Sequence, residues 1–272
     1  MIPVPLEERT DKRLYQIFFI WFSGDTNIFT YYGAVIPSTL NVISCQGYLI
    51  ANTIIGGQTL GSVSPHVGST IGIIIIALVT LLVVFSGYRV VHCYETFVWI
   101  PNVIAFVIML AISGKHIIMT PLANLSPIPP SAIMTAGASV AATNITWAAL
   151  TPDYGVYHDG NASFCRIFFY AYLGLLISSM PAHMLGAAWT AGAAFVPAWK
   201  AGLGNGNDIG GLLAAVLAPA GGFGKFLLVL LSLTTPSQCA PAMYTVCNSF
   251  MTLAPACAKI PRLVLLGAST VM

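Results

Sequence analysis

The stretch VGSTIGIIIIALVTLLVVFSGY, residues 67–88, decides the fold class of this chain. It holds no Asp, Glu, Lys or Arg and lies inside a charge-free interval that runs from Asp25 to Arg89. An α-helix needs about 20 apolar residues to cross the hydrocarbon core of a bilayer. The stretch therefore predicts a transmembrane helix.

The rest of the chain follows the same pattern. Charged residues make up 7% and hydrophobic residues 57% of the 272 residues, whereas an ordinary soluble domain carries about 25% charged residues. So few charges cannot cover the surface of a soluble protein of this size. Five more apolar intervals predict spans, at residues 31–60, 97–112, 131–150, 164–189 and 226–253. Residues 14–22 and 262–272 are also apolar but too short to cross.

Lysine and arginine positions predict the orientation, because cytoplasmic loops carry an excess of both. With the N-terminal cations inside, alternating spans divide the remaining cations between two sides. Arg89, Arg166, Lys259 and Arg262 fall inside, and Lys115, Lys200 and Lys225 fall outside. We predict a cytoplasmic tail over residues 1–13 and, over residues 14–272, one incomplete transmembrane domain of about six full spans. The net charge of +2 forms no basic cluster, so no nucleic-acid partner is expected.

Helix breakers mark the apolar run 226–253 and the segment before it. Pro236 and Pro241 predict an interrupted helix of the kind that transporters place at a substrate site, with a simple proline kink as the alternative. Residues 201–224 have glycine-rich ends around a short apolar helix, which predicts a gate-like element on the outer face. The six cysteines are dispersed and form no CxxC pair, which is typical of small buried side chains.

Polar side chains recur on the span 31–60. Asn41, Tyr48 and Asn52 are offset by seven and eleven residues, which places them on one helical face. They form either a wall that hydrogen-bonds a planar polar solute or contacts between helices. The Gly56-Gly57 pair and the Gly57-x-x-x-Gly61 spacing predict close helix packing.

Motifs for catalysis are missing from the sequence. It has no HExxH, no nucleophile elbow and no pair of carboxylates at metal-ligand spacing. We therefore expect no enzyme, no cofactor and no metal site. A lone His183 is typical of a structurally satisfied histidine. Glu95 and Asp153, which flank spans on the inner side, are titratable groups that a transport cycle can use or that solvent and cations can satisfy.

Several motifs resemble the fungal purine-cytosine permease branch of the nucleobase-cation-symport-1 family. They are IANTIIGGQ (50–58), GYRVVHCYE (87–95), WIPN (99–102), TPDYGVYH (151–158) and HMLGAA (183–188). The resemblance covers nearly the whole chain. It implies an all-helical integral membrane transporter with twelve spans, ten of them in a five-plus-five inverted repeat of the LeuT type around a midplane site. It also implies proton-coupled import of a nucleobase across the plasma membrane.

The resemblance assigns roles to particular residues. Tyr48 corresponds to an aromatic residue that stacks on the base, Asn52 to a carboxamide that hydrogen-bonds it, and Trp147 to the other half of an aromatic sandwich. Gln238 is the remaining carboxamide of a motif that is richer in asparagine in cytosine permeases. Our expected substrate site is Tyr48, Asn52, Trp147 and Gln238, with Asn41 and Asp153 as weaker candidates.

Two departures from the family pattern qualify these expectations. The motif Gln238-Cys-Ala-Pro241-Ala242 lacks an amide contact, which keeps a vitamin-type carrier of pyridoxine or thiamine open as an alternative. Residues 21–30 resemble the opening of the first family span but run directly into the start of the third. We therefore expect an internal deletion of most of two spans and a shortened C-terminal part, with a truncated, non-transporting fragment as the remaining alternative.

Overall fold

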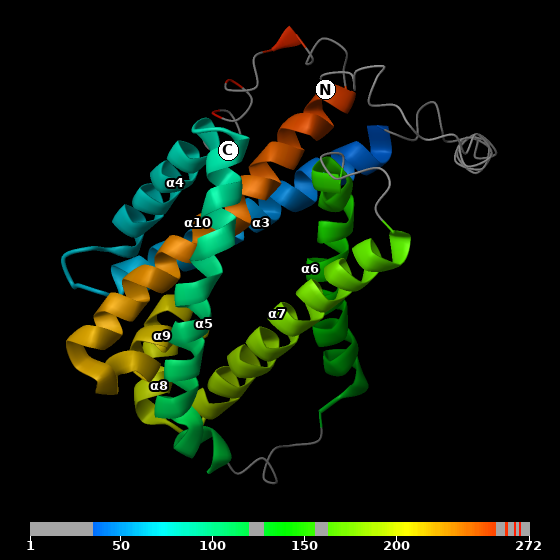
Figure 1. Ribbon diagram of the computed structural model, residues 1–272. Helices are drawn as coiled ribbons and strands as arrows, with labels where there is room; N and C mark the ends of the chain where they lie inside the picture. Colours follow the sequence, from blue (N-terminus) through cyan, green and yellow to red (C-terminus); the bar gives the residue numbers. More distant parts are fainter. Residues whose placement is uncertain are drawn as a thin grey trace.

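The computed structural model describes residues 35–119, 128–155 and 163–253, together with residues 259–260, 264 and 267 (Figure 1). Every element in the three long ranges is helical. The elements are α3 (Val35–Gly61), α4 (Ser69–Phe85), α5 (Tyr88–Ile118), α6 (Pro130–Gly155), α7 (Phe164–Ala193), α8 (Pro197–Leu203), α9 (Ile209–Leu217), the short 3₁₀ helix η3 (Ala218–Ala220) and α10 (Gly221–Leu253).

Each of the six predicted spans lies on a helix, and the helices differ in how apolar they are. Three helical stretches in the described part of the chain are long and apolar enough to cross a membrane: Cys93–Ile118, Phe164–Ala193 and Ile209–Met251. The apolar helix α4 is shorter, with 17 residues. Helices α3 and α6 have 27 and 26 residues, but their carboxamides, hydroxyls and glycines make them less apolar than those three.

Helix α10 is the centre of the packing. It contacts α3, α4, α5 and α9, and Figure 1 shows it running obliquely along α3 while α5 passes across it. One buried cluster joins α3, α4 and α10 through side chains such as Cys45, Val84 and Val246. A second joins α5, α7, α8, α9 and α10 through Trp189 and Trp199. Helix α6 has fewer neighbours, with contacts to α3 and α10.

Glycines allow α3 to approach its neighbours at backbone distance, as the sequence predicted. A Cβ atom added to Gly57 would lie 2.5 Å from the backbone nitrogen of Ile73 on α4. A Cβ atom on Gly72 would lie 2.2 Å from the carbonyl oxygen of Gly57. On the next face, a Cβ atom on Gly56 would lie 2.6 Å from the Thr235 hydroxyl of α10. The two helix crossings of α3 therefore depend on the missing side chains.

The prediction of an interrupted helix at the two prolines is wrong, because α10 is helical from Gly221 to Leu253 with Pro236 and Pro241 inside it. Each proline lacks the N–H that would bond the carbonyl four residues before it, at Ser232 and Ser237. Packing of α10 against α3, α4, α5, α6 and α9 holds the helix together through both positions.

Hydroxyl groups on this part of α10 bond to the backbone of their own helix. Ser232, Thr234 and Ser237 each donate to the carbonyl three residues earlier, at 2.6–2.8 Å. In other helices the donors Thr53, Thr80 and Ser113 reach the carbonyl four residues earlier. The Tyr94 hydroxyl on α5 adds a bond to the Leu233 carbonyl. These donors reach the carbonyls of Val229, Leu231, Leu233 and Thr234, which are not the two carbonyls that the prolines leave without an N–H partner.

The segment before α10 confirms the predicted short apolar helix, which is α9. Asp208 caps it, since a carboxylate oxygen accepts from the Gly211 N–H at 2.8 Å. Gly210 brings α9 against α3: a Cβ atom there would lie 2.2 Å from the Gln58 carbonyl carbon. Gln58 in turn donates to the Asn207 carbonyl at 3.1 Å. The gating role predicted for this element stays a prediction.

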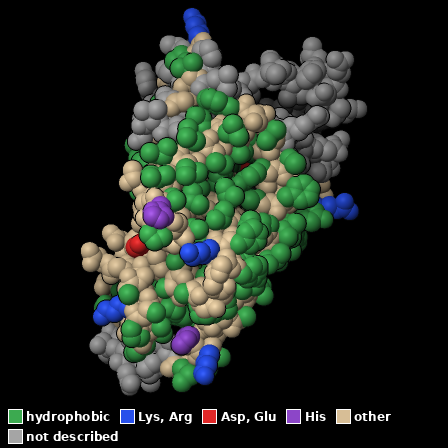
Figure 2. Space-filling view, turned by 90° about the vertical axis from the view of Figure 1, so that its left-hand side faces the viewer, with side chains coloured by type: hydrophobic (Ala, Val, Ile, Leu, Met, Phe, Trp, Pro, Cys, Tyr) green, Lys and Arg blue, Asp and Glu red, His purple; other side chains and the backbone are tan. Residues whose placement is uncertain are grey.

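The ends of the helices separate the described cations into two groups, and the orientation in the membrane stays a prediction. Helices α5 and α7 begin toward the upper part of Figure 1 and end at the bottom, while α10 runs the opposite way. Arg89 and Arg166 lie at the starts of α5 and α7, whereas Lys115 lies in the last turn of α5 and Lys225 in the first turn of α10. Figure 2 shows a broad hydrophobic face on which the charged side chains are few and separated.

The cysteines follow the prediction only in part. Cys45, Cys239 and Cys247 are buried together in the α3–α4–α10 cluster. Cys93 and Cys165 are exposed on α5 and α7. Their exposed surface belongs to apolar membrane-length helices, where a small hydrophobic side chain can face lipid as well as protein. Cys257 lies outside the described residues.

Candidate functional site

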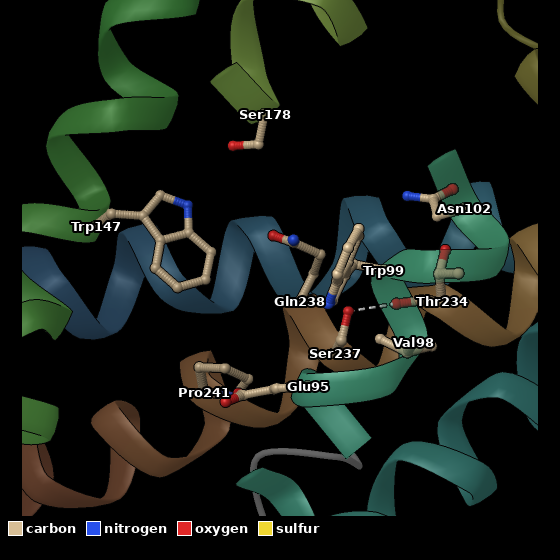
Figure 3. Close-up of a pocket in the computed structure, with 10 residues that line it drawn as sticks. All are labelled: Glu95, Val98, Trp99, Asn102, Trp147, Ser178, Thr234, Ser237, Gln238 and Pro241. Carbon is tan, nitrogen blue, oxygen red and sulfur yellow. Dashed lines mark hydrogen bonds between the residues drawn. The ribbon is translucent and has the colours of Figure 1, made fainter. Parts of the chain in front are cut away.

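A cavity of about 380 Å³ lies where α5, α6, α7 and α10 come together (Figure 3). This volume is near the lower end of the range of about 300–1,000 Å³ that is typical of small-molecule sites. The lining residues are Glu95, Val98, Trp99, Asn102, Trp147, Ser178, Thr234, Ser237, Gln238 and Pro241. The cavity therefore has the size for one small ligand and a lining that mixes aromatic, carboxamide, hydroxyl and carboxylate groups.

Two helices supply most of the lining with the same spacing. On α5 the lining positions are 95, 98, 99 and 102, and on α10 they are 234, 237, 238 and 241. Steps of three, four and seven residues place side chains on one face of an α-helix. The cavity is thus framed by one face of α5 and one face of α10, which contact each other directly. Helices α6 and α7 each add one residue, Trp147 and Ser178.

The two indole rings stand on either side of the Gln238 carboxamide in Figure 3. Trp147 comes from α6 and Trp99 from α5, and the Gln238 side chain points from α10 into the space between them. Aromatic faces bind flat rings by stacking. A carboxamide offers both a donor and an acceptor to the edge of such a ring, and an ionised carboxylate such as Glu95 offers acceptors only. The arrangement is suited to a planar, polar heterocycle.

The cavity brings together two of the four residues that we expected in the site, Trp147 and Gln238. The other two, Tyr48 and Asn52, are half-buried on α3 and do not line it. Of the weaker candidates, Asn41 donates from its side-chain nitrogen to the Ser249 hydroxyl on α10 at 3.0 Å, so it links two helices. Asp153 lies at the end of α6, but its side chain is outside the described part of the structure.

Trp99 and Asn102 line the cavity, although sequence reasoning used them only as part of a motif. Glu95 lines it too, and we had considered it only as a group at the membrane surface. A usable signal was present, because Glu95, Trp99 and Asn102 follow one helical face of an otherwise apolar segment. Polar groups at such positions face other helices or a cavity and avoid lipid.

Other polar groups are satisfied within their own helices. The His183 ring nitrogen Nδ1 lies 2.6 Å from the Ser179 carbonyl on α7, as expected for a structurally satisfied histidine. In the three long ranges that the structure describes, no group of three or more His, Cys, Asp or Glu side chains is placed to hold a metal ion.

Comparison with known proteins places the chain in one class. A family model described as permeases for cytosine/purines, uracil, thiamine and allantoin matches residues 31–271. The purine-cytosine permease fcyB of Emericella nidulans is 36% identical over 235 residues, which are 84% of this chain and 45% of that protein. The purine-cytosine permease FCY21 of Saccharomyces cerevisiae is 35% identical over 237 residues, which are 85% of this chain and 44% of that protein.

The vitamin B6 transporter TPN1 of Saccharomyces cerevisiae is 24% identical over 241 residues, which are 86% of this chain and 42% of that protein. No solved structure matches the chain. The chain spans a little under half the length of these curated relatives.

Helices of membrane-spanning length and this match together define an integral membrane permease and not an enzyme. The chain belongs to the nucleobase-cation-symport-1 family, the permeases for cytosine/purines, uracil, thiamine and allantoin.

Proposed function

We propose that this chain forms part of a secondary active importer that carries a nucleobase of the cytosine or purine type, or a similar flat heterocycle, across the plasma membrane together with protons. The observation that carries this proposal is the cavity between α5 and α10, in which two indoles and a carboxamide converge. Relatives named as purine-cytosine permeases support the same substrate class.

The cavity chemistry supports a base more than an aliphatic solute. Trp147 gives a stacking surface, and Gln238 pairs with a ring edge that carries a donor beside an acceptor. Glu95 lies in the membrane-length stretch Cys93–Ile118. A carboxylate within a span is costly and marks a functional pathway by default. It accepts N–H groups of a bound base when ionised, and it can carry a proton when neutral.

A vitamin-type substrate is the second candidate, and two observations favour it. One relative is named a vitamin B6 transporter. The α10 motif has a single carboxamide, Gln238, followed by Cys239 and Ala240, which are both buried and cannot hydrogen-bond a ligand strongly. A site that lacks one amide contact discriminates against the ligand that needs it. Pyridoxine has hydroxyl groups on a six-membered ring and makes fewer demands on carboxamide donors.

Ligand-dependent thermal stabilisation tests whether the chain binds such molecules. The purified full chain in lipid nanodiscs is heated with cytosine, adenine, hypoxanthine, pyridoxine or thiamine. A ligand at 100 times its Kd stabilises the folded state by about 2.7 kcal/mol. We expect a raised Tm with at least one of these ligands and its loss in Trp147→Ala and in Gln238→Ala. Thr190→Ala is the control, because that hydroxyl is exposed and bonds its own helix.

The same assay distinguishes binding in the cavity from binding along α3. Asn52→Ala removes a carboxamide that the family resemblance assigns to the substrate but that does not line the cavity. Unchanged stabilisation in Asn52→Ala, with loss in Gln238→Ala, places binding in the cavity. The reverse result places it along α3. The absence of stabilisation with every ligand, in the wild-type chain, refutes the proposed function.

Uptake into proteoliposomes tests the coupling. We expect accumulation of the stabilising ligand when the outside is more acidic than the inside, and no accumulation after a protonophore removes the gradient. Accumulation that is indifferent to the pH gradient contradicts proton coupling. Recovery of the ligand as a different compound contradicts transport and indicates an enzyme.

A further inference from the structure

We propose that Trp99 and Asn102, in the WIPN motif of α5, contact the transported heterocycle directly. Trp99 is the aromatic wall that faces Trp147, and Asn102 is a second carboxamide that reads another edge of the ring. This inference rests on the proposed function and identifies which helix supplies the second half of its site.

The first observation is which side chains of α5 line the cavity. Trp99 and Asn102 both line the cavity, while the intervening Ile100 and the following Val103 are exposed and do not. Trp99 and Asn102 are three residues apart and share the cavity face. The motif therefore places an indole and a carboxamide on the face of α5 that lines the cavity, together with Glu95 and Val98.

The hydrogen bonding of the carboxamide side chains also supports the proposal. Two carboxamides, one on α3 and one on α6, have partners within the protein: Asn41 bonds Ser249, and Asn144 donates to the Val140 carbonyl at 3.1 Å. Within the described part of the chain, neither the Asn102 nor the Gln238 side chain makes a hydrogen bond, and both line the cavity. An unpaired carboxamide on a membrane-spanning helix is costly. A bound ligand with donors and acceptors removes that cost at both positions.

The position of the Trp99 ring is the third observation that supports the proposal. Trp99 is 57% exposed on a membrane-length helix. An interfacial anchor is the other usual role of such a tryptophan. An anchor needs no carboxamide beside it, whereas Trp99 stands next to the Gln238 side chain in Figure 3, with Asn102 beyond it. Tyr48 does not line the cavity, so α5 supplies the aromatic surface opposite Trp147.

The second carboxamide bears on selectivity. Gln238 alone reads one edge of a ring, and Asn102 on another helix reads a different one. A heterocycle with polar groups on two edges, such as cytosine or adenine, satisfies both, and a ring with one polar edge leaves a carboxamide unpaired. Leaving a site group unpaired is the stronger way to reject a ligand.

Equilibrium binding of radiolabelled cytosine and adenine to the full chain in nanodiscs tests the proposal. Alanine replacement of a stacking side chain weakens binding by about 1–3 kcal/mol per base, so Trp99→Ala should raise the Kd about 5- to 150-fold. Trp99→Phe should raise it less. Phe97→Ala is the matched control, because Phe97 is 62% exposed on the same helix and does not line the cavity.

Asn102→Asp tests the carboxamide, because it keeps the size of the side chain and removes its donors. We expect a rise in Kd of about 3- to 10-fold, by different factors for cytosine and adenine. Asn144→Asp, on a carboxamide that bonds its own helix, should leave both values unchanged. Tryptophan fluorescence gives a second measurement, which reports the contact itself and not the stability of the variant. Ligand-induced quenching of tryptophan emission should fall in Trp99→Phe and persist in Phe97→Ala.

The outcomes separate this inference from the proposed function. If the wild-type chain binds a base and Trp147→Ala weakens binding, but Trp99→Ala and Asn102→Asp do not, the α5 contacts are refuted and the transporter proposal stands. If the wild-type chain binds neither base and none of the vitamin ligands, the proposed function fails, and this inference fails with it.

Discussion

Replacing Gly57 by alanine tests the crossing of α3 and α4 directly. The new Cβ atom would lie 2.5 Å from the nitrogen and 2.7 Å from the Cα atom of Ile73. These are backbone atoms, so no rotamer change relieves the overlap, and the helices must move apart by about 1 Å to restore ordinary contacts of 3.4 Å or more. Overpacking of this kind costs about 1–3 kcal/mol. We expect Gly57→Ala to be near the upper value.

Gly47→Ala is the matched control on the same helix. No atom lies within 4 Å of a Cβ atom placed there. Alanine is favoured over glycine inside a helix by about 0.5–1 kcal/mol, so this variant should be as stable as the wild type or slightly more stable. The two variants should therefore differ by roughly 2–4 kcal/mol in free energy of unfolding.

Unfolding by SDS titration in mixed micelles, followed by far-UV circular dichroism, measures this difference. The reasoning fails if Gly57→Ala unfolds at the same SDS fraction as Gly47→Ala. That result would mean that α3 and α4 are not in backbone contact at Gly57. A loss of stability in both variants to the same extent would also contradict it, because the open surroundings of Gly47 predict no cost.

Three further predictions use the same titration. Trp189→Phe removes the buried indole donor 2.8 Å from the Ser113 hydroxyl and should cost about 1–3 kcal/mol; an unchanged midpoint would exclude this bond. Tyr94→Phe removes the hydroxyl bonded to the Leu233 carbonyl and should cost about 0.5–1.5 kcal/mol, and a neutral effect would show that α10 does not need this donor. Asp208→Ala removes the cap of α9 and should cost about 0.5–2 kcal/mol, which full stability of the variant would contradict.

Apolar length predicted the existence of the helices better than their bounds. The third span was expected at residues 97–112, yet α5 runs from Tyr88 to Ile118. Apolarity marks the part of a helix that lies in hydrocarbon, whereas backbone hydrogen bonding continues into the interface. Arg89 and Lys115 therefore belong to the helix although they lie outside the predicted apolar run.

Side-chain positions in the site were harder to predict than helices. Trp147 and Gln238 came from the resemblance to the family, and the cavity includes both. Trp99 and Asn102 were missed because they were interpreted only as part of a motif, although with Glu95 they follow one face of an otherwise apolar helix. That face on α5 meets α10, whose stretch near Pro236 stays helical through packing that the proline pattern does not predict.

The two prolines of α10 give this helix a mechanical property. Two missing backbone bonds within about two turns lower its resistance to bending, and proline sites are where long helices bend. The helical segments before and after the prolines keep their backbone hydrogen bonds and bend less easily. Because Gln238 and Pro241 lie where the helix bends most easily, a small change in the angle between the two segments moves one wall of the cavity relative to α5. The cavity thus lies beside the most flexible part of the longest helix described.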